Sequence, residues 1–308
     1  MRYFVTGGAG FIGSNFVEYL FENVQDLTGV TIFDKFTYAA NPKNYEKYLT
    51  DPRLQVINGD ICDLLLLVES MKNHDFVIHF AAESHVDRSI DDASAFIQTN
   101  VLGTLNVLEA SRKNEIKTVI HISTDEVYGS LPEGSANENY SLLPNSPYAA
   151  SKAASDLLAR SFFVTHGLDV RTTRCCNNYG KNQYPEKLIP LVLSKIKKGE
   201  PLPIYGTGEN IREWIHVSEH CQAIQLILDH GKPGEVYNIG SGLELKNLDL
   251  VKILLELTGS KKSKINFVKD RLGHDLRYSI DSSKIRDMGF EPQIELREGL
   301  KDLIALES

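Results

Sequence analysis

Five short apolar runs alternate with helical stretches up to residue 122, and this alternation constrains the fold more than any other feature. Strands that are apolar throughout are typical of parallel sheets covered by helices on both faces. We therefore predict an α/β fold with a Rossmann-like doubly wound parallel sheet. The runs are 3–5, 30–33, 54–57, 76–80 and 118–122, with helices expected near 12–22, 63–72 and 93–113.

The second half of the sequence is organised differently. A helix over 148–165 and a strand over 169–173 continue the alternation, but prolines and glycines interrupt it after about residue 178. The run 235–239 again reads as a buried strand, which indicates that the chain returns to the first domain. We predict a first domain over 1–176, to which later segments such as 211–240 return. A smaller α/β lobe is expected mainly over 177–308.

Composition and charge argue against several classes of protein. The chain is 42% hydrophobic and carries a formal net charge of -8, so it lacks the basic surface of a nucleic-acid binder. No apolar run approaches the roughly 18 residues of a membrane span, and Met1 leads directly into a strand, so we expect neither a membrane segment nor a signal peptide. The four cysteines show no paired C-x-x-C spacing, which favours reduced thiols in a cytoplasmic protein and no metal site.

Glycines 7, 10 and 13 lie between the first apolar run and the first expected helix. In that position they allow a tight turn and the close approach of a pyrophosphate to the helix N-terminus. Asp34 ends the second run, 21 positions past Gly13, where a carboxylate hydrogen-bonds the adenosine ribose and repels a 2′-phosphate. We therefore predict that the first domain binds NAD rather than NADP; the alternative is a tight turn without a ligand.

Residues at the ends of other expected strands complete the predicted cofactor site. Asp60 can read the adenine amino group or cap the helix that begins near residue 63. Asn100 binds either a ligand or a group within its own helix. The predicted cofactor-binding residues are Gly7, Gly10, Phe11, Ile12, Gly13, Asp34, Lys35, Thr37, Asp60, Ile61, Phe80, Ala81, Ala82, Thr99, Tyr148 and Lys152.

Thr124, Asp125 and Glu126 follow the last of the five runs, so they are expected at the carboxyl edge of the sheet, where doubly wound folds bind ligands. A turn with a helix cap is the alternative for such polar residues. Tyr148 and Lys152 are four positions apart and share one face of a helix. A lysine beside a phenol lowers the tyrosine pKa, so Tyr148 can act as a base near neutral pH. The adjacent carboxyl groups add an acid and a base whose pKa values are pushed apart.

These motifs resemble those of the extended short-chain dehydrogenase/reductases, and within them the nucleotide-sugar 4,6-dehydratases, above all the dTDP-glucose 4,6-dehydratases. The Tyr148 and Lys152 pair is shared by the whole superfamily, whereas the Asp125-Glu126 pair is specific to the dehydratases. The resemblance covers nearly the whole chain. It rests on the segments 6–13, 81–89, 123–129, 146–152, 177–180, 185–190, 203–206, 211–214 and 270–275.

The resemblance implies a lyase that converts dTDP-glucose to dTDP-4-keto-6-deoxyglucose. In such enzymes Tyr148 would take the proton of the 4-hydroxyl while hydride leaves C4 for NAD, with Thr124 at the same oxygen and Lys152 on the nicotinamide ribose. Glu126 would then remove the C5 proton and Asp125 would protonate the departing 6-hydroxyl. Hydride returns to C6, so NAD ends unchanged.

The resemblance also implies a site for a nucleotide-diphosphate hexose in the second lobe. Asn177 and Arg212 would bind phosphate oxygens, and Tyr205 would stack on or hydrogen-bond the base. Backbone groups at Lys187 and Leu188 would lie near the base. The substrate-binding residues so implied are Ser84, His85, Thr124, Asn177, Lys187, Leu188, Pro203, Tyr205, Arg212, Asn247, Arg271 and His274.

Two alternatives share this fold, and one belongs to a different class. Leu272 and Leu276 depart from the family pattern beside the nucleotide pocket, so a 4,6-dehydratase for UDP-N-acetylglucosamine or UDP-glucose stays open. A 4-epimerase needs no acid at C6, which the Asp125-Glu126 pair argues against. The third is a silent NAD-binding scaffold. Because the family is usually dimeric, a homodimer is expected in which the helices near 93–113 and 148–165 form a four-helix bundle.

Overall fold

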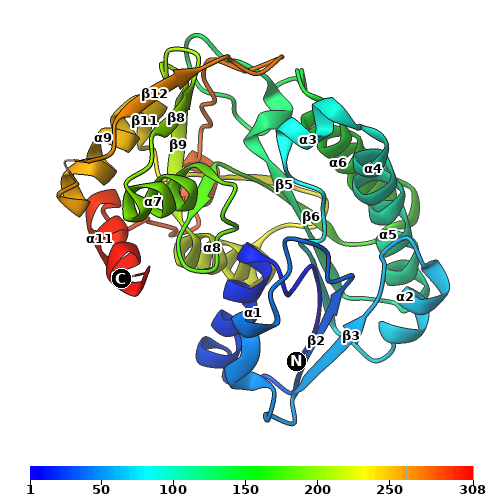
Figure 1. Cartoon of the computed structure of the whole chain (residues 1–308). Helices are drawn as coiled ribbons and strands as arrows, with labels where there is room; N and C mark the ends of the chain where they lie inside the picture. Colours follow the sequence, from blue (N-terminus) through cyan, green and yellow to red (C-terminus); the bar gives the residue numbers. More distant parts are fainter. Residues whose placement is uncertain (261, 308) are drawn as a thin grey trace.

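A computed structural model describes residues 1–260 and 262–307 and places them in a larger and a smaller lobe (Figure 1). The larger lobe contains a seven-stranded sheet of order β10-β6-β5-β4-β1-β2-β3, in which every neighbouring pair is parallel. This confirms the predicted doubly wound sheet. The order reverses beside β1, where such folds bind ligands. The strands are β1 (Arg2–Thr6), β2 (Gly29–Asp34), β3 (Leu54–Asn58), β4 (Phe76–His79), β5 (Thr118–Thr124), β6 (Val170–Cys175) and β10 (Val236–Ile239).

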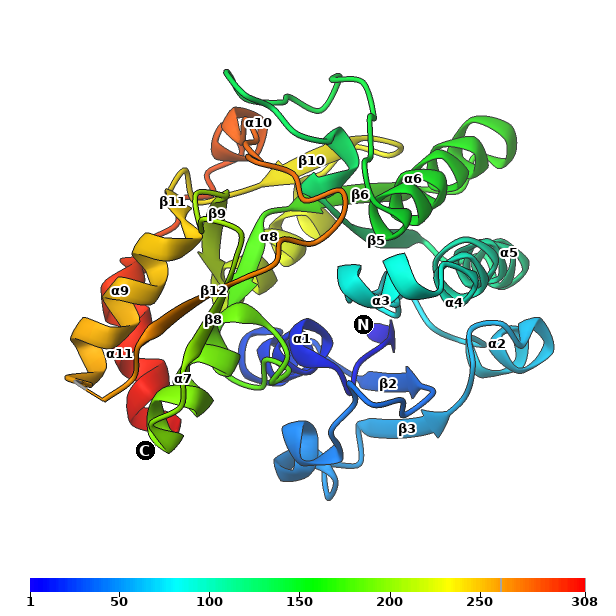
Figure 2. The same ribbon diagram turned by 45° about the horizontal axis from the view of Figure 1, so that its top comes forward.

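Helices cover both faces of this sheet because alternate strand residues point to opposite sides. On one face Tyr3 and Val5 pack in a core shared with α1 (Phe11–Asn23) and α8 (Val217–His230). On the other face Phe4 packs in a core shared with α2 (Leu64–Ser70), α5 (Thr104–Lys113) and α6 (Pro147–His166). Figure 2 shows these two layers with the sheet between them.

Local sequence signals fix α6, the helix that carries Tyr148 and Lys152. The side chain of Ser146 accepts a hydrogen bond from Ala149 N, and Pro147 occupies the first helical position. The helix ends at His166 and is capped by Gly167, whose φ of +70° suits glycine. These boundaries place Tyr148 in the first turn and Lys152 one turn further along.

The helix expected near 93–113 is not regular. It divides into α4 (Ser94–Phe96), a π-helix η2 (Ile97–Gly103) and α5. π-helical turns are rare and frequently lie at functional sites. The remaining short elements of this lobe are η1 (Pro42–Tyr48), α3 (Val86–Asp91) and η3 (Asp125–Tyr128).

The smaller lobe has its own core around Trp214, Leu250 and Leu300. β7 (Asn177–Tyr179), β9 (Ile211–His216) and β11 (Glu244–Lys246) form a sheet of order β11-β9-β7, and β8 (Leu202–Tyr205) pairs with β12 (Ile265–Val268). The helices of this lobe are α7 (Leu188–Lys198), α9 (Asn247–Thr258) and α11 (Leu296–Glu307), whereas α10 (Ser283–Arg286) packs on β10 of the larger lobe through Ile285. Within the described part of the chain, no helix has the length and apolarity needed to cross a membrane.

Candidate functional site

The glycine loop joins β1 to α1 and packs against the segment that follows β4. Gly7 has a φ of +69°, and a Cβ atom built there would lie 2.6 Å from the backbone nitrogen of Ala81. Both the conformation and the space therefore require glycine. Gly10 precedes α1, whose first turn contains Phe11, Ile12 and Gly13 and no acidic residue. The positive end of the helix dipole and its first amides thus face the loop without a competing carboxylate.

Asp34 ends β2 with its carboxylate turned toward this loop. Its Oδ2 accepts a hydrogen bond from Ala9 N at 3.0 Å, and its Oδ1 accepts one from Phe36 N at 2.9 Å. Burial raises the pKa of Asp34, and the two backbone hydrogen bonds oppose that rise. Each carboxylate oxygen keeps a second acceptor site, so Asp34 can still bind a ligand hydroxyl.

Asp60 follows β3 and is ion-paired with Lys35 at 2.6 Å. Its Oδ1 also accepts a hydrogen bond from Cys62 N at 2.9 Å. The cap of α2 is Asp63, so the helix-cap alternative for Asp60 does not hold. Ile61 is buried in the core beneath.

Asn100 has a structural role, because its side-chain amide is occupied by hydrogen bonds within the protein and not left for a ligand. Its Oδ1 accepts a hydrogen bond from Glu83 N at 2.8 Å, and its Nδ2 donates to Glu83 O at 2.9 Å and to Ser151 Oγ at 2.8 Å. The side chain is 1% exposed. It thereby fixes the loop after β4, which contains Ala81 and Ala82, against α6.

Three polar side chains gather where β5 ends and η3 begins. Oγ1 of Thr124 accepts a hydrogen bond from Glu126 N at 3.3 Å and donates one to Asp125 Oδ1 at 3.2 Å. The same hydroxyl hydrogen-bonds Tyr148. The helix cap that was the alternative for these residues is therefore present. Its hydrogen bonds are what hold Thr124, Asp125 and Glu126 together.

Asp125 is 2% exposed, and its Oδ2 is a buried atom with no hydrogen-bond partner among the described residues. Burial, followed by the charge of Glu126, raises the pKa of Asp125 well above its usual range. Burial and the neighbouring charge therefore both favour the neutral acid at Asp125. Glu126 is only half-buried, and its Oε2 lies 3.3 Å from the hydroxyl of Tyr278.

Tyr148 does not have the low pKa that its spacing from Lys152 led us to expect. Burial, followed by the charge of Glu126, raises the pKa of Tyr148, although the hydrogen bond with Thr124 opposes this. Burial lowers the pKa of Lys152 to about 8, and its Nζ donates to Ile122 O at 2.6 Å. The expectation is wrong for the chain's own groups, because desolvation and the neighbouring carboxylates outweigh the hydrogen bond with Thr124.

A buried ionic network lies beneath these residues and fixes α6 against β5 and β6. Asp156, one turn beyond Lys152, lies 2.9 Å from Arg174 Nε and 3.2 Å from His121 Nε2. Despite the opposing effect of burial, His121 and Arg174 lower the pKa of Asp156. Removing one partner of such a network leaves an uncompensated buried charge, so it holds the helix in one position.

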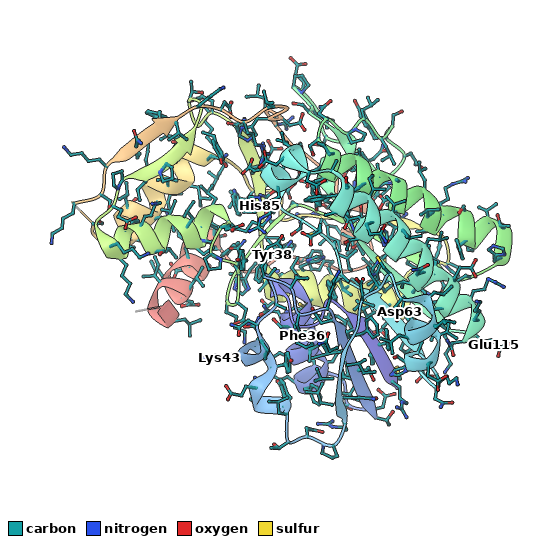
Figure 3. The ribbon with its side chains drawn as sticks, turned by 45° about the vertical axis from the view of Figure 1, so that its right-hand side comes forward. Phe36, Tyr38, Lys43, Asp63, His85 and Glu115 are labelled. Atoms are coloured by element: carbon teal, nitrogen blue, oxygen red, sulfur yellow. The ribbon has the colours of Figure 1, made fainter. Side chains whose placement is uncertain are left out.

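A second group of charged side chains converges on the loop after β4 from the smaller lobe. Lys187 Nζ donates to Ser84 O at 2.9 Å. Glu186 forms an ion pair with Arg88 Nη2 at 2.6 Å, and its carboxylate lies 3.3 Å from His85 Nε2. His85 lies in the central region of the molecule in Figure 3. Ser84 is exposed, whereas burial lowers the pKa of His85.

Asp87 of α3 reaches two residues predicted to bind the nucleotide. Its Oδ2 accepts a hydrogen bond from the Tyr205 hydroxyl at 3.2 Å, and its Oδ1 lies 3.9 Å from Arg271 Nη1. The Tyr205 ring meets His274 edge-on at 6.1 Å, and His274 Nδ1 lies 2.6 Å from Asp270 Oδ1. The rings of Tyr205 and His274 and the cation of Arg271 therefore lie together beside Asp87.

Arg212 is 4% exposed and lies over the Tyr278 ring at 4.1 Å. Its Nη2 donates to Asp275 O at 2.9 Å, and the Tyr278 hydroxyl donates to Asp275 Oδ2 at 2.9 Å. This stack connects the predicted phosphate-binding arginine to Glu126.

The other predicted positions lie at the ends of elements or on the surface. Phe80 follows β4 and packs on α1 at 5.6 Å from the Phe16 ring, and Thr99 lies half-buried in η2. Thr37 is exposed in the loop after β2. Asn177, Leu188 and Asn247 begin β7, α7 and α9, and Pro203 lies within β8.

No role was predicted for Tyr278, Glu186 or Asp87, although each contacts residues predicted in the site. Glu186 and Asp87 lie inside segments that carry the resemblance, and that position was their only signal. Tyr278 lies three positions beyond the last matched segment, 270–275. Only the fold brings it to Glu126, 152 positions earlier in the chain.

Comparisons with known proteins find similar chains over nearly the whole length of this one. Residues 4–303 match the family model described as GDP-mannose 4,6 dehydratase. A dTDP-glucose 4,6-dehydratase of Actinoplanes is 49% identical over 99% of this chain and 97% of that protein. The crystal structure of the dTDP-glucose 4,6-dehydratase DesIV of Streptomyces venezuelae, with NAD bound, has a TM-score of 0.97 and 51% identity over 99% of this chain and 96% of that one. A Thermus thermophilus UDP-glucose 4-epimerase in complex with NAD has a TM-score of 0.91 and 27% identity over 99% and 98% of the two chains.

Proposed function

The chain belongs to the GDP-mannose 4,6 dehydratase family, and we propose that it is an NAD-dependent lyase that converts dTDP-glucose to dTDP-4-keto-6-deoxyglucose. The observation that carries the proposal is a buried carboxylic acid, Asp125, beside the more exposed carboxylate of Glu126 and one hydroxyl away from Tyr148. Oxidation alone needs neither carboxyl group. The dTDP-glucose 4,6-dehydratases among the relatives favour dTDP-glucose over a UDP-sugar as the substrate.

The residues around the glycine loop fit NAD. A side chain at Gly7 would fill the space beside Ala81, and the N-terminus of α1 offers amides to a pyrophosphate. The Asp34 carboxylate suits the adenosine ribose hydroxyls and disfavours a 2′-phosphate. When bound, NAD supplies the hydride acceptor for the oxidation at C4 and the donor for the reduction at C6.

Tyr148 is the base of the oxidation and removes the proton of the 4-hydroxyl, while Thr124 holds the same oxygen. Because the chain's own groups raise the pKa of Tyr148, its ionisation needs the positive charge that Lys152 and the cofactor bring to the phenol. Lys152 is held in place by Ile122 O and by the charge of Asp156.

Glu126 and Asp125 carry out the dehydration. The 4-ketone makes the C5 proton acidic, and the half-buried Glu126 removes it. Asp125, held protonated by burial and by Glu126, gives its proton to the 6-hydroxyl, which leaves as water. The two neighbouring carboxyl groups thus act as base and acid because their environments differ.

The nucleotide diphosphate binds on the side of the smaller lobe. Arg212, Arg271 and Asn177 would contact phosphate oxygens, and Tyr205 would contact the base. Lys187, Leu188, Pro203, Asn247 and His274 line this side, with Ser84 and His85 toward the sugar. Cys175, Cys176 and Cys221 are buried thiols, which suits a cytoplasmic location.

The function is tested by substrate incubation and by one variant. The purified protein with NAD should give the alkaline absorbance of a 4-keto-6-deoxy sugar from dTDP-glucose, and much less from UDP-glucose or UDP-N-acetylglucosamine. Glu126→Gln should still oxidise C4, so NADH accumulates, while product formation falls by about 100-fold or more. Dehydration at the parent rate by Glu126→Gln would contradict the role of Glu126, and no keto sugar from any of the three would refute the function.

We also propose that the protein is a homodimer through a four-helix bundle of η2–α5 and α6 from each copy. Four large apolar side chains on these helices are 39–63% exposed in the single chain: Ile97, Leu102, Leu157 and Val164. Leu157→Glu should convert the dimer to a monomer in light scattering. Leu306→Glu changes a leucine of α11 that is more exposed than Leu157 and should leave the dimer intact. A parent protein that is already monomeric at micromolar concentration would refute the proposal.

A further inference from the structure

The proposed reaction leaves two residues in the wrong protonation state after each turnover. Tyr148 has gained the proton of the 4-hydroxyl, and Asp125 has lost a proton to the departing water. Glu126 returns its proton to C5 and is already reset. One proton must therefore travel from Tyr148 to Asp125, or be exchanged with solvent at both residues, before the next substrate reacts.

Solvent exchange is hindered at both ends. Asp125 is 2% exposed and Tyr148 is 8% exposed, and the free oxygen of Asp125, Oδ2, is a buried atom. Beneath them, the network of Asp156, His121 and Arg174 is also buried. This burial favours a route for the proton within the protein.

Thr124 connects the two residues directly. A hydroxyl group can donate one hydrogen bond and accept two. Oγ1 of Thr124 donates to Asp125 Oδ1 at 3.2 Å and accepts from Glu126 N at 3.3 Å. Hydrogen bonding with Thr124 also opposes the rise in the pKa of Tyr148, so the two hydroxyls are neighbours. Because the one proton of Thr124 is donated to Asp125, a protonated Tyr148 is the donor toward Thr124, and the donors point from Tyr148 through Thr124 to Asp125.

We propose that Thr124 is the proton relay that resets the active site, in addition to any contact it makes with the sugar. The phenol O–H bond of Tyr148 breaks and its proton binds Thr124 Oγ1, while the former Thr124 proton binds Asp125 Oδ1. Thr124 ends as a neutral hydroxyl that now donates to the phenolate. Asp125 ends as a carboxylic acid, and nothing is oxidised or reduced.

The environment of Asp125 favours this direction. Its burial and the nearby charge of Glu126 both stabilise the neutral acid over the carboxylate. At the other end, Lys152 favours the phenolate once the oxidised cofactor is restored. Burial and Glu126 also oppose the phenolate of Tyr148, so the transfer depends on the positive charge that Lys152 and the oxidised cofactor bring to that end.

The test compares the first turnover with later ones in the holoenzyme, by rapid quench with excess dTDP-glucose. Thr124→Val keeps the shape and removes the hydroxyl, and it should slow the first turnover through loss of the Tyr148 hydrogen bond. Later turnovers should be slower again by about tenfold or more, giving a burst of one product per site. The slow phase should accelerate as pH falls and show a solvent deuterium effect, because Asp125 must then take its proton from water.

Two variants serve as references. Thr124→Ser restores the hydroxyl and should restore the parent ratio of first to later turnover rates. Ser123→Ala removes the preceding buried hydroxyl of β5, which is outside the relay, and should leave that ratio unchanged. An equal loss of rate in the first and later turnovers of Thr124→Val would overturn the relay. The relay rests on the proposed function. If the proposed function were wrong, neither the parent nor any variant would form a keto sugar, which distinguishes that outcome from failure of the relay alone.

Discussion

The hydroxyl of Tyr278 lies 3.3 Å from Oε2 of Glu126, the base proposed for the dehydration. The same hydroxyl lies 2.9 Å from Asp275 Oδ2, and Arg212 covers the ring. Burial, followed by the charge of Glu126, raises the pKa of Tyr278, so the phenol stays protonated at any working pH. Its single proton is shared between Asp275 at 2.9 Å and Glu126 at 3.3 Å, so it orients Glu126 through the longer of two hydrogen bonds and does not compete with it as a base.

Tyr278→Phe should slow the loss of water and leave C4 oxidation intact. The ring and its contact with Arg212 remain, but Glu126 loses a hydrogen bond worth about 1 kcal/mol or somewhat more, equivalent to about tenfold in rate. Single-turnover measurements should show NADH persisting longer than in the parent. Tyr140→Phe, on an exposed tyrosine, is the control and should behave as the parent does. Faster decay of NADH in Tyr278→Phe would contradict the orienting role.

Lys152 should titrate near pH 8 in the protein without ligands, well below its ordinary value of about 10.4. Lys152 loses its proton at a lower pH in the folded chain than in the unfolded chain. The free energy of unfolding therefore increases as pH rises from about 8 to about 10.4. The stability deficit of the parent relative to Lys152→Met should shrink over that window in denaturant titrations. Nitrogen-15 NMR of labelled lysines, assigned with the same variant, gives the pKa directly. An ordinary lysine pKa would contradict the burial argument.

Gly7→Ala should destabilise the fold strongly, by about 3 kcal/mol or more, because the new methyl group meets the backbone of Ala81 and the φ of +69° is strained for alanine. Gly134→Ala is the matched control. Its φ is +71°, but nothing lies within 4 Å of the added Cβ, so only the cost of the conformation, about 1 kcal/mol, remains. Urea unfolding of both variants measures the difference. Equal destabilisation would show that the contact with Ala81 is unimportant.

Asp34→Asn should weaken NAD binding and relieve the discrimination against NADP. The charged acceptor for the ribose is lost, which corresponds to about 10- to 100-fold in the KM for NAD. The KM for NADP should rise less or fall, because a repulsive charge disappears at the same time. Measuring both cofactors on one variant separates this effect from general damage to the loop, which would weaken both equally.

The sheet could be predicted well because each of its strands is recognisable from its own residues. Runs such as 30–33 and 118–122 are apolar throughout, and only burial on both faces explains that pattern. The π-helix η2 was not predictable, since it depends on Asn100 reaching Glu83 and Ser151 across the fold. Helical periodicity in 93–113 carries no information about such a contact.

The features of the candidate site also separate into those predictable from local sequence and those that depend on the fold. Asp125 and Glu126 are adjacent, so the separation of roles between two carboxyl groups could be argued from their spacing alone. The pKa of Tyr148 could not be predicted from spacing, because the extent of desolvation is set by the packing around α6 and not by the distance to Lys152. Tyr278 was missed for a related reason: its partner Glu126 is far away in sequence.

The smaller lobe is not a detachable module. The chain passes from β6 to β7, returns through α8 to β10, and leaves again to β11, so the sheet edge at β10 and the helix beneath β1 are both encoded after residue 210 (Figure 1). A fragment that stops at residue 176 would expose the apolar side of α1 that α8 covers and leave β6 as an unprotected edge. Exchanging substrate lobes between relatives would therefore require at least three separate grafts, and new specificity is reached more readily through individual loops such as 269–277.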